Sequence, residues 1–201
     1  MNVTDASFVK RAADGEALPS EEGGRPEAVL VGCANAGKST LLNRIVERED
    51  LATPSDTPER TSAFDVYRLE RAGGDPLHLL DAPGVGHAGA PEEKRARRQR
   101  FLARYLAERA PLRLVLHCID SRRALQPLDR ELLALLGGQR VPYVAVLTKA
   151  DALDQNEHAS AVRRAKETLL EAGLEAPVVL TSARVGDGIE EVRAWIGDLV
   201  R

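Results

Sequence analysis

The chain of 201 residues has the composition of an ordinary globular protein, with 43% apolar and 29% charged residues. Its formal net charge of −3 argues against a protein coated with basic residues for nucleic acid. No apolar run approaches the roughly 20 residues that span a membrane, and the opening segment MNVTDASFVKRAADGEALPSEEGG lacks the apolar stretch of a signal peptide. The two cysteines, Cys33 and Cys118, do not suggest a disulfide framework. We therefore expect a cytoplasmic protein, or one of an organellar matrix if the source is eukaryotic.

Residues 1–27 are polar and are predicted to form an extended N-terminal arm, which Phe8 and Val9 could dock onto a domain formed by 28–201. Beyond the arm, short apolar runs alternate with longer segments of helical period. Strands are predicted at 28–32, 63–69, 77–81, 112–120, 141–148 and 177–183, and helices at 38–48, 91–109, 128–136, 156–172 and 189–200. This alternation predicts a three-layer α/β fold, with a mostly parallel six-stranded sheet, one antiparallel strand and helices on both faces. Ligands of such sheets bind beyond the carboxyl ends of the strands.

A phosphate-binding loop is predicted between the first strand of this domain and its first helix. The segment GCANAGKS at 32–39 fits the pattern G-x-x-x-x-G-K-[ST] in the structural context that the motif requires. Its backbone N–H groups would form an anion site, Lys38 would lie between the β- and γ-phosphates, and the Ser39 hydroxyl would ligate Mg²⁺. The residues predicted to contact the phosphates are Asn35, Ala36, Gly37, Lys38, Ser39 and Thr40.

Two further segments are predicted to surround the phosphates. In DAPG at 81–84, Asp81 can hold Mg²⁺ through a water, and Gly84 can offer its N–H to a γ-phosphate. Alone this tetrapeptide is only a turn, and its place after the phosphate loop favours the functional interpretation. In PSDTPERTSAF, Thr57 or Thr61 can complete the Mg²⁺ shell, and spacing alone does not choose between them.

The nucleotide base is predicted from two strand ends. In TKAD at 148–151, Asp151 can accept hydrogen bonds from the N1–H and N2–H₂ edge of guanine, whereas adenine offers no such pair of donors. The stem of Lys149 can lie along the base. In TSA at 181–183, Ser182 and the N–H of Ala183 could contact the guanine carbonyl. In this order the segments predict GTP and GDP as ligands.

With these motifs in order, the chain resembles the EngB (YihA/YsxC) family of ribosome-biogenesis GTPases over about residues 7–200. The loop at 32–43 is similar to the family's GRSNVGKSSLIN, and DAPGVGHA is similar to its DLPGYGYA. The segment TPERTS resembles the family's TPGRTQ, which selects Thr61 as a catalytic and metal-binding residue beside Asn35, Lys38 and Gly84. VLTKADAL matches too, with Thr148 where most GTPases have Asn. The resemblance implies a single P-loop GTPase domain that binds Mg²⁺, acts in assembly of the large ribosomal subunit and is linked to cell division.

Several residues depart from the family pattern. Cys33 stands for an Arg in the phosphate loop, Glu59 for a Gly in the switch segment, and Phe101 for a Trp. Val85 follows DAPG where Ras-like enzymes place a water-orienting Gln, so we expect slow intrinsic turnover. Two roles stay open for Asn35: it holds K⁺ against the phosphates, as in similar GTPases, or it bonds only within its own loop.

A basic run, KRARRQR, follows the second switch segment. It places Lys94, Arg97, Arg100 and Arg104 on a helix that could contact rRNA phosphates, or could equally be a solvated surface balanced by nearby glutamates. We expect a monomer whose partner is the large ribosomal subunit or its precursor, with no membrane partner. Two alternatives are a GTP-binding adaptor without significant hydrolysis and a P-loop kinase of small molecules.

Overall fold

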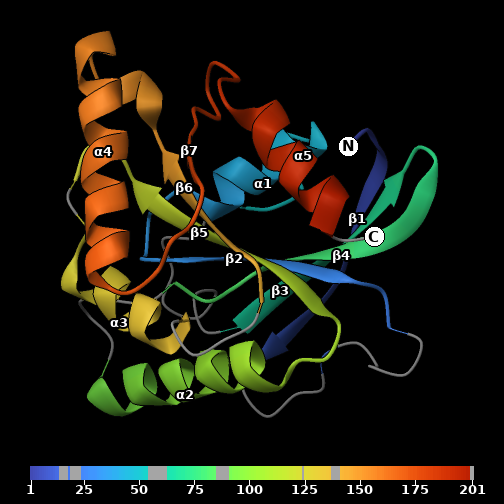
Figure 1. Ribbon diagram of the computed structural model, residues 1–201. Helices are drawn as coiled ribbons and strands as arrows, with labels where there is room; N and C mark the ends of the chain where they lie inside the picture. The colour runs from blue at the N-terminus through green and yellow to red at the C-terminus, as the bar shows by residue number, and fades with distance from the viewer. Residues whose placement is uncertain are drawn as a thin grey trace.

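A mostly parallel sheet organises the chain (Figure 1). The computed structural model describes residues 1–13, 18, 24–53, 63–84, 91–123, 125–136 and 141–199. The strands of this described part are β1 (Val3–Ala13), β2 (Glu27–Gly32), β3 (Ala63–Arg71), β4 (Gly74–Asp81), β5 (Leu112–Asp120), β6 (Tyr143–Thr148) and β7 (Val178–Leu180). The helices are α1 (Lys38–Val46), α2 (Glu92–Glu108), α3 (Pro127–Leu136), α4 (Gln155–Glu171) and α5 (Ile189–Leu199), with a short 3₁₀ helix at Ala150–Ala152.

The strands lie in the order β1-β3-β4-β2-β5-β6-β7. Strands β4, β2, β5, β6 and β7 pair in parallel, and β3 runs antiparallel to both β4 and β1. Strand β2 is buried along its whole length, as expected for a central parallel strand covered on both faces. The α/β fold and the single antiparallel strand are therefore confirmed. The predicted number of six strands is wrong, because the described residues form seven.

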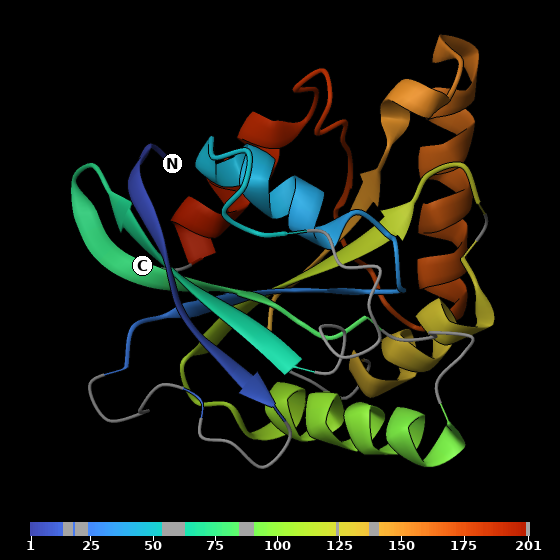
Figure 2. The same ribbon diagram turned by 180° about the vertical axis from the view of Figure 1, so that it is seen from behind.

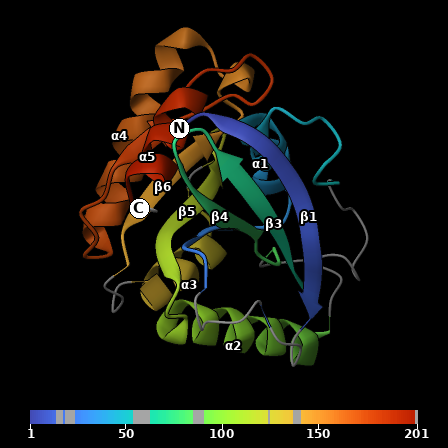
Figure 3. The same ribbon diagram turned by 90° about the vertical axis from the view of Figure 1, so that its right-hand side faces the viewer.

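The additional strand is β1, which lies within the segment predicted as an N-terminal arm. It forms the edge of the sheet beside β3 (Figure 3). Within β1 only Ala6 and Ala12 are buried, while Phe8 and Val9 stay half-exposed; the Phe8 ring meets Tyr67 edge to face at 5.7 Å. An edge strand covered on so little of its surface lacks a strong alternation of apolar and polar residues, which is why the pattern did not reveal it. The division of the chain at residue 27 stays a prediction.

Two helical layers cover the sheet, as Figure 1 and the view from behind in Figure 2 show. On one face, α1 and α5 pack on alternate residues of β2 to β6, with Leu42, Ile45 and Ile196 fully buried. On the other face, α2, α3 and α4 cover residues such as Val115 and Leu147. The three-layer arrangement is confirmed. The loops that follow the parallel strands lie together at the carboxyl edge of the sheet.

The helices begin and end where local sequence signals place them. Helix α4 starts with a capping box, in which Asp154 and Glu157 satisfy each other's backbone N–H groups. Each predicted helix is found, with its ends shifted by a few residues at most. In the described part of the chain, no helix is both long and apolar enough to cross a membrane.

Candidate functional site

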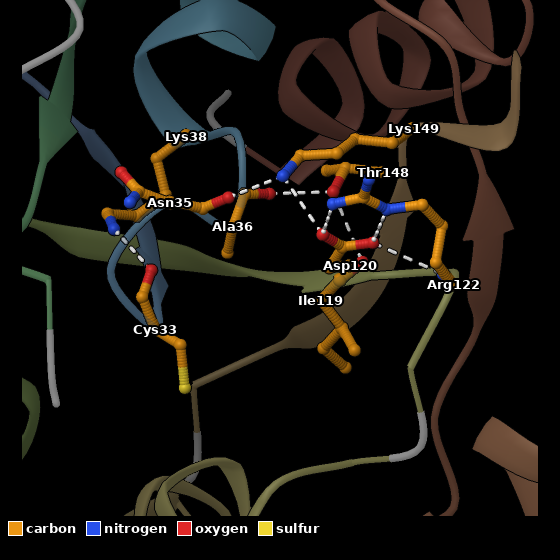
Figure 4. Close-up of polar contacts among 9 residues, drawn as sticks. All are labelled: Cys33, Asn35, Ala36, Lys38, Ile119, Asp120, Arg122, Thr148 and Lys149. Atoms are coloured by element: carbon orange, nitrogen blue, oxygen red, sulfur yellow. Dashed lines mark hydrogen bonds and ion pairs between the residues drawn. The ribbon is translucent and has the colours of Figure 1, made fainter. Parts of the chain in front are cut away.

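The phosphate loop connects β2 to α1 and is pressed against β5. Gly32 has a φ of 145°, and a Cβ at this position would lie 2.3 Å from the carbonyl oxygen of Cys118. Only glycine fits that approach. The Lys38 ammonium donates to the carbonyl oxygen of Gly32 at 3.2 Å. It also donates to that of Cys33 at 3.1 Å (Figure 4). The loop thus holds the Lys38 ammonium against its own backbone.

A hydroxyl and a carboxylate meet at the start of α1. Ser39 Oγ donates to Asp81 Oδ2 at 2.6 Å, and Asp81 Oδ1 is buried with no hydrogen-bond partner among the described residues. Burial raises the pKa of Asp81, although the nearby Lys38 charge and the Ser39 bond oppose the rise. Oxygen ligands of these two types suit Mg²⁺, and an unpartnered carboxylate oxygen fits the arrival of a cation with its water shell. Thr57 and Thr61 lie outside the described residues.

The segment at 81–84 closes the other side of the cavity. A Cβ on Gly84 would lie 3.1 Å from Ala34 Cα and 3.3 Å from Lys38 Nζ, so this close packing against the phosphate loop favours glycine. Between the two segments lies a cavity of about 280 Å³. Its lining comprises Arg11, Ala34, Asn35, Gly37, Lys38, Ser39, Thr40, Thr53, Ala63, Asp65, Asp81, Ala82, Pro83, Gly84 and Lys149.

The end of β6 is fastened to the same loop (Figure 4). Thr148 Oγ1 lies 2.6 Å from the carbonyl oxygen of Ala36 and 3.2 Å from that of Ile119. Its single proton can serve one of them at a time, and the shorter contact goes to the phosphate loop. Lys149 has a left-handed backbone, with φ of 62°, and its ammonium donates to the Asn35 carbonyl oxygen at 2.6 Å. The predicted phosphate and base segments are therefore brought together.

Asp120, at the end of β5, is a site residue that the sequence reasoning missed. Its Oδ2 accepts from the Lys149 ammonium at 2.9 Å, and its two oxygens accept from the Arg122 guanidinium at 2.8 and 2.6 Å. Burial alone would raise the pKa of Asp120, but the bonds from Arg122 and Lys149 outweigh it and hold that pKa well below its ordinary value. The carboxylate stays charged and orients Lys149. Its position at the carboxyl end of a parallel strand was the available signal.

The two predicted base-binding segments also meet. Ser182 Oγ donates to Asp151 Oδ1 at 2.6 Å, and the Ala150 N–H donates to the Thr181 carbonyl oxygen at 3.0 Å. Ser182 is fully buried, whereas Asp151 is exposed. Ala183 follows directly and is partly exposed. The Asp151 carboxylate is thus anchored at one oxygen and faces solvent.

Cys33 is partly buried and contacts a buried polar pair behind the phosphate loop, Asp129 and His117. Its Sγ donates to Asp129 Oδ1 at 3.1 Å, and the same oxygen lies 3.3 Å from Nε2 of the buried His117. Burial, together with the Asp129 charge, raises the pKa of the Cys33 thiol to about 12. The residue that departs from the family's Arg is therefore a neutral hydrogen-bond donor that ties the loop to α3.

These features define a class of protein. A phosphate loop, a hydroxyl–carboxylate pair suited to Mg²⁺ and two joined base-binding segments, all at the carboxyl edge of a parallel sheet, are those of a P-loop GTPase. The family model described as 50S ribosome-binding GTPase matches residues 27–149. The probable GTP-binding protein EngB of Cereibacter sphaeroides is 37% identical over 193 residues, which cover 96% of this chain and 86% of that protein. That of Rhodospirillum rubrum is 36% identical over 195 residues, covering 96% and 84%. The chain belongs to the EngB family of GTPases.

Solved structures agree with this fold. A crystal structure of a probable GTP-binding protein engB superimposes with a TM-score of 0.67 at 20% identity, covering 87% of this chain and 98% of that one. Era in complex with MgGDPNP and nucleotides 1506–1542 of 16S ribosomal RNA gives a TM-score of 0.69 at 20% identity, covering 88% and 57%. At such identities the likeness supports the fold alone.

Proposed function

We propose that this GTPase binds GTP and GDP with Mg²⁺ and acts as a slow nucleotide switch in assembly of the large ribosomal subunit. The observation that carries the proposal is the link from the base side to the phosphate side of the site. Lys149 reaches from the end of β6 to the Asn35 carbonyl oxygen, 2.6 Å away, and Asp120 holds it there. A nucleotide that spans both sides would meet one preorganised surface.

Guanine selection is assigned to Asp151. Its carboxylate is held at Oδ1 by Ser182 and can accept from the two neighbouring N–H groups of a guanine edge. With adenine these acceptors would face another acceptor and lose both bonds. Family membership in the GTPases also removes the support for a small-molecule kinase. The Asp81–Ser39 pair is assigned to Mg²⁺, which would neutralise charge between the β- and γ-phosphates.

Hydrolysis is proposed to be slow because Val85 cannot orient a water. Thr61 and Val85 lie outside the described residues, so their roles are inferred from the sequence. Asn35 is exposed at the cavity, and Lys149 binds its backbone carbonyl rather than its side-chain amide. Its amide is therefore available to help hold K⁺ against the phosphates. Turnover measured in KCl against NaCl, with and without 50S subunits, tests this role; no turnover under any condition would favour the adaptor alternative.

The proposed ribosomal contact is the basic surface of α2, made of Lys94, Arg97, Arg100 and Arg104. All four are exposed, and they fall three or four residues apart along the helix. Arg104 also forms an exposed ion pair with Glu108. The matching family is described as 50S ribosome-binding, which supports this partner. A cytoplasmic location and a link to division follow from the same proposal.

Co-sedimentation with 50S subunits tests the switch. Binding should be stronger with a non-hydrolysable GTP analogue than with GDP or no nucleotide, and should weaken as salt rises. Reversing Arg97, Arg100 and Arg104 to Glu should abolish binding, while reversing Arg163, Arg164 and Lys166, exposed on α4, should not. Binding that is indifferent to nucleotide, or an equal loss in both triple variants, would refute the proposal.

A further inference from the structure

Three charged residues form a row across β1, β3 and β4. Arg11 lies directly opposite Asp65 in the β1–β3 pair, and Asp65 lies directly opposite Asp81 in the β3–β4 pair. Residues opposite each other in antiparallel strands share a face of the sheet and lie about 5 Å apart. All three residues line the phosphate cavity. Figure 3 shows the three strands side by side.

Arg11 and Asp65 form a two-pronged ion pair. The guanidinium donates to Asp65 Oδ1 and Oδ2 at 2.6 and 2.7 Å. The Arg11 side chain is 40% exposed, so the pair adds little to the stability of the fold. The Asp65 side chain is only 18% exposed, however, and its charge faces the cavity beside Asp81. The position of the pair therefore matters for what enters the cavity.

We infer that Asp65 is a second carboxylate of the Mg²⁺ site, acting through the ion's water shell, and that Arg11 sets its effective charge. The inference rests on the proposed Mg²⁺–nucleotide site. Mg²⁺ keeps several waters when it binds to proteins, and a carboxylate next to Asp81 can hold one of them. Asp81, Asp65 and Arg11 together carry a net charge of −1. Removing the Arg11 charge makes it −2, and removing the Asp65 charge makes it zero.

The two single substitutions are therefore expected to act in opposite directions. A unit charge about 8 Å from a divalent ion changes its affinity about three- to fivefold at low salt. The quantity to compare is the Mg²⁺ midpoint, the Mg²⁺ concentration at which half of the effect of Mg²⁺ on nucleotide dissociation is reached. Arg11→Gln should lower this midpoint by that factor, and Asp65→Asn should raise it by the same factor. The double variant, with its net charge restored to −1, should lie close to the unsubstituted protein.

The experiment measures dissociation of a fluorescent GDP analogue during a MgCl₂ titration in dilute buffer, with thermal melts of every variant. Asp5→Asn is the matched control, because Asp5 also lies on β1 and binds Arg48 at 2.7 Å but does not line the cavity. It should leave the Mg²⁺ midpoint unchanged. Should Asp65→Asn fail to fold, the direction of the Arg11→Gln shift decides alone.

Shifts of Arg11→Gln and Asp65→Asn in the same direction would mean that the pair only fastens β1, and would overturn the inference. So would midpoints that match the Asp5→Asn control. Failure of the unsubstituted protein to bind GDP would instead refute the proposed function, which keeps the two failures distinct.

Discussion

Thr148 gives the sharpest test of how the base side organises the phosphate loop. Its hydroxyl donates to the Ala36 carbonyl oxygen at 2.6 Å, and its side chain is nearly fully buried. Thr148→Val keeps the shape and β-branching of the side chain while removing the donor. The buried Ala36 carbonyl oxygen then loses this hydrogen bond, and the phosphate loop is no longer bonded to the end of β6 through Thr148.

The expected cost follows from the burial of that bond. Leaving a buried acceptor without its donor costs about 1–3 kcal/mol, and the loop can recover part of this by shifting toward water. We expect Thr148→Val to lower the free energy of unfolding by about 1–2 kcal/mol. Because the shifted loop must be reordered by the nucleotide, GDP affinity should fall about five- to tenfold, which corresponds to about 1–1.4 kcal/mol.

Thr181→Val is the matched control. Thr181 is also fully buried, and its hydroxyl donates to the Leu147 carbonyl oxygen at 3.1 Å, but that oxygen keeps the Thr181 N–H at 2.6 Å. Urea unfolding and titration with fluorescent GDP should show a stability loss of no more than about 1 kcal/mol and an unchanged GDP affinity. Equal GDP affinities in the two variants would refute the idea that Thr148 orders the phosphate loop.

Two other predictions concern the base and the thiol. Asp151→Asn should weaken GTP binding about 100-fold or more, because it removes one acceptor of the guanine hydrogen bonds. It should improve binding of xanthosine triphosphate, whose C2 oxygen can accept from the new amide. Competition with fluorescent GDP measures both affinities, and an unchanged preference for GTP would contradict the assignment. The pKa of the half-buried Cys33 thiol is raised to about 12 by burial and Asp129, so its alkylation by iodoacetamide at pH 8 should be at least about a hundredfold slower in the native protein than in urea. The native rate should still rise above pH 9. Mass spectrometry locates the label, and a fast native reaction would contradict the raised pKa.

Much of the fold could be predicted because its signals are local. Buried parallel strands such as β2 and β5 read as continuous apolar runs, and the helices carry a period close to 3.6. The phosphate loop is likewise a contiguous motif whose function depends on its own backbone. What the sequence did not reveal are pairings across long separations. Arg11 meets Asp65 over 54 positions and Cys33 meets Asp129 over 96, and no local pattern specifies either contact.

The site residues that were not predicted from the sequence, Asp120 and Arg11, differ in how predictable they were. Asp120 ends β5 as Thr148 ends β6, and the two are direct neighbours in the β5–β6 register. The rule that parallel strands deliver polar residues to one edge therefore applies to Asp120 as well, but Asp120 was predicted only as the last residue of a strand. Arg11 obeys no such rule, because it lies on an edge strand next to the one antiparallel strand. Its place at the cavity depends on the β1–β3 register, which the folded structure shows and no local sequence pattern specifies.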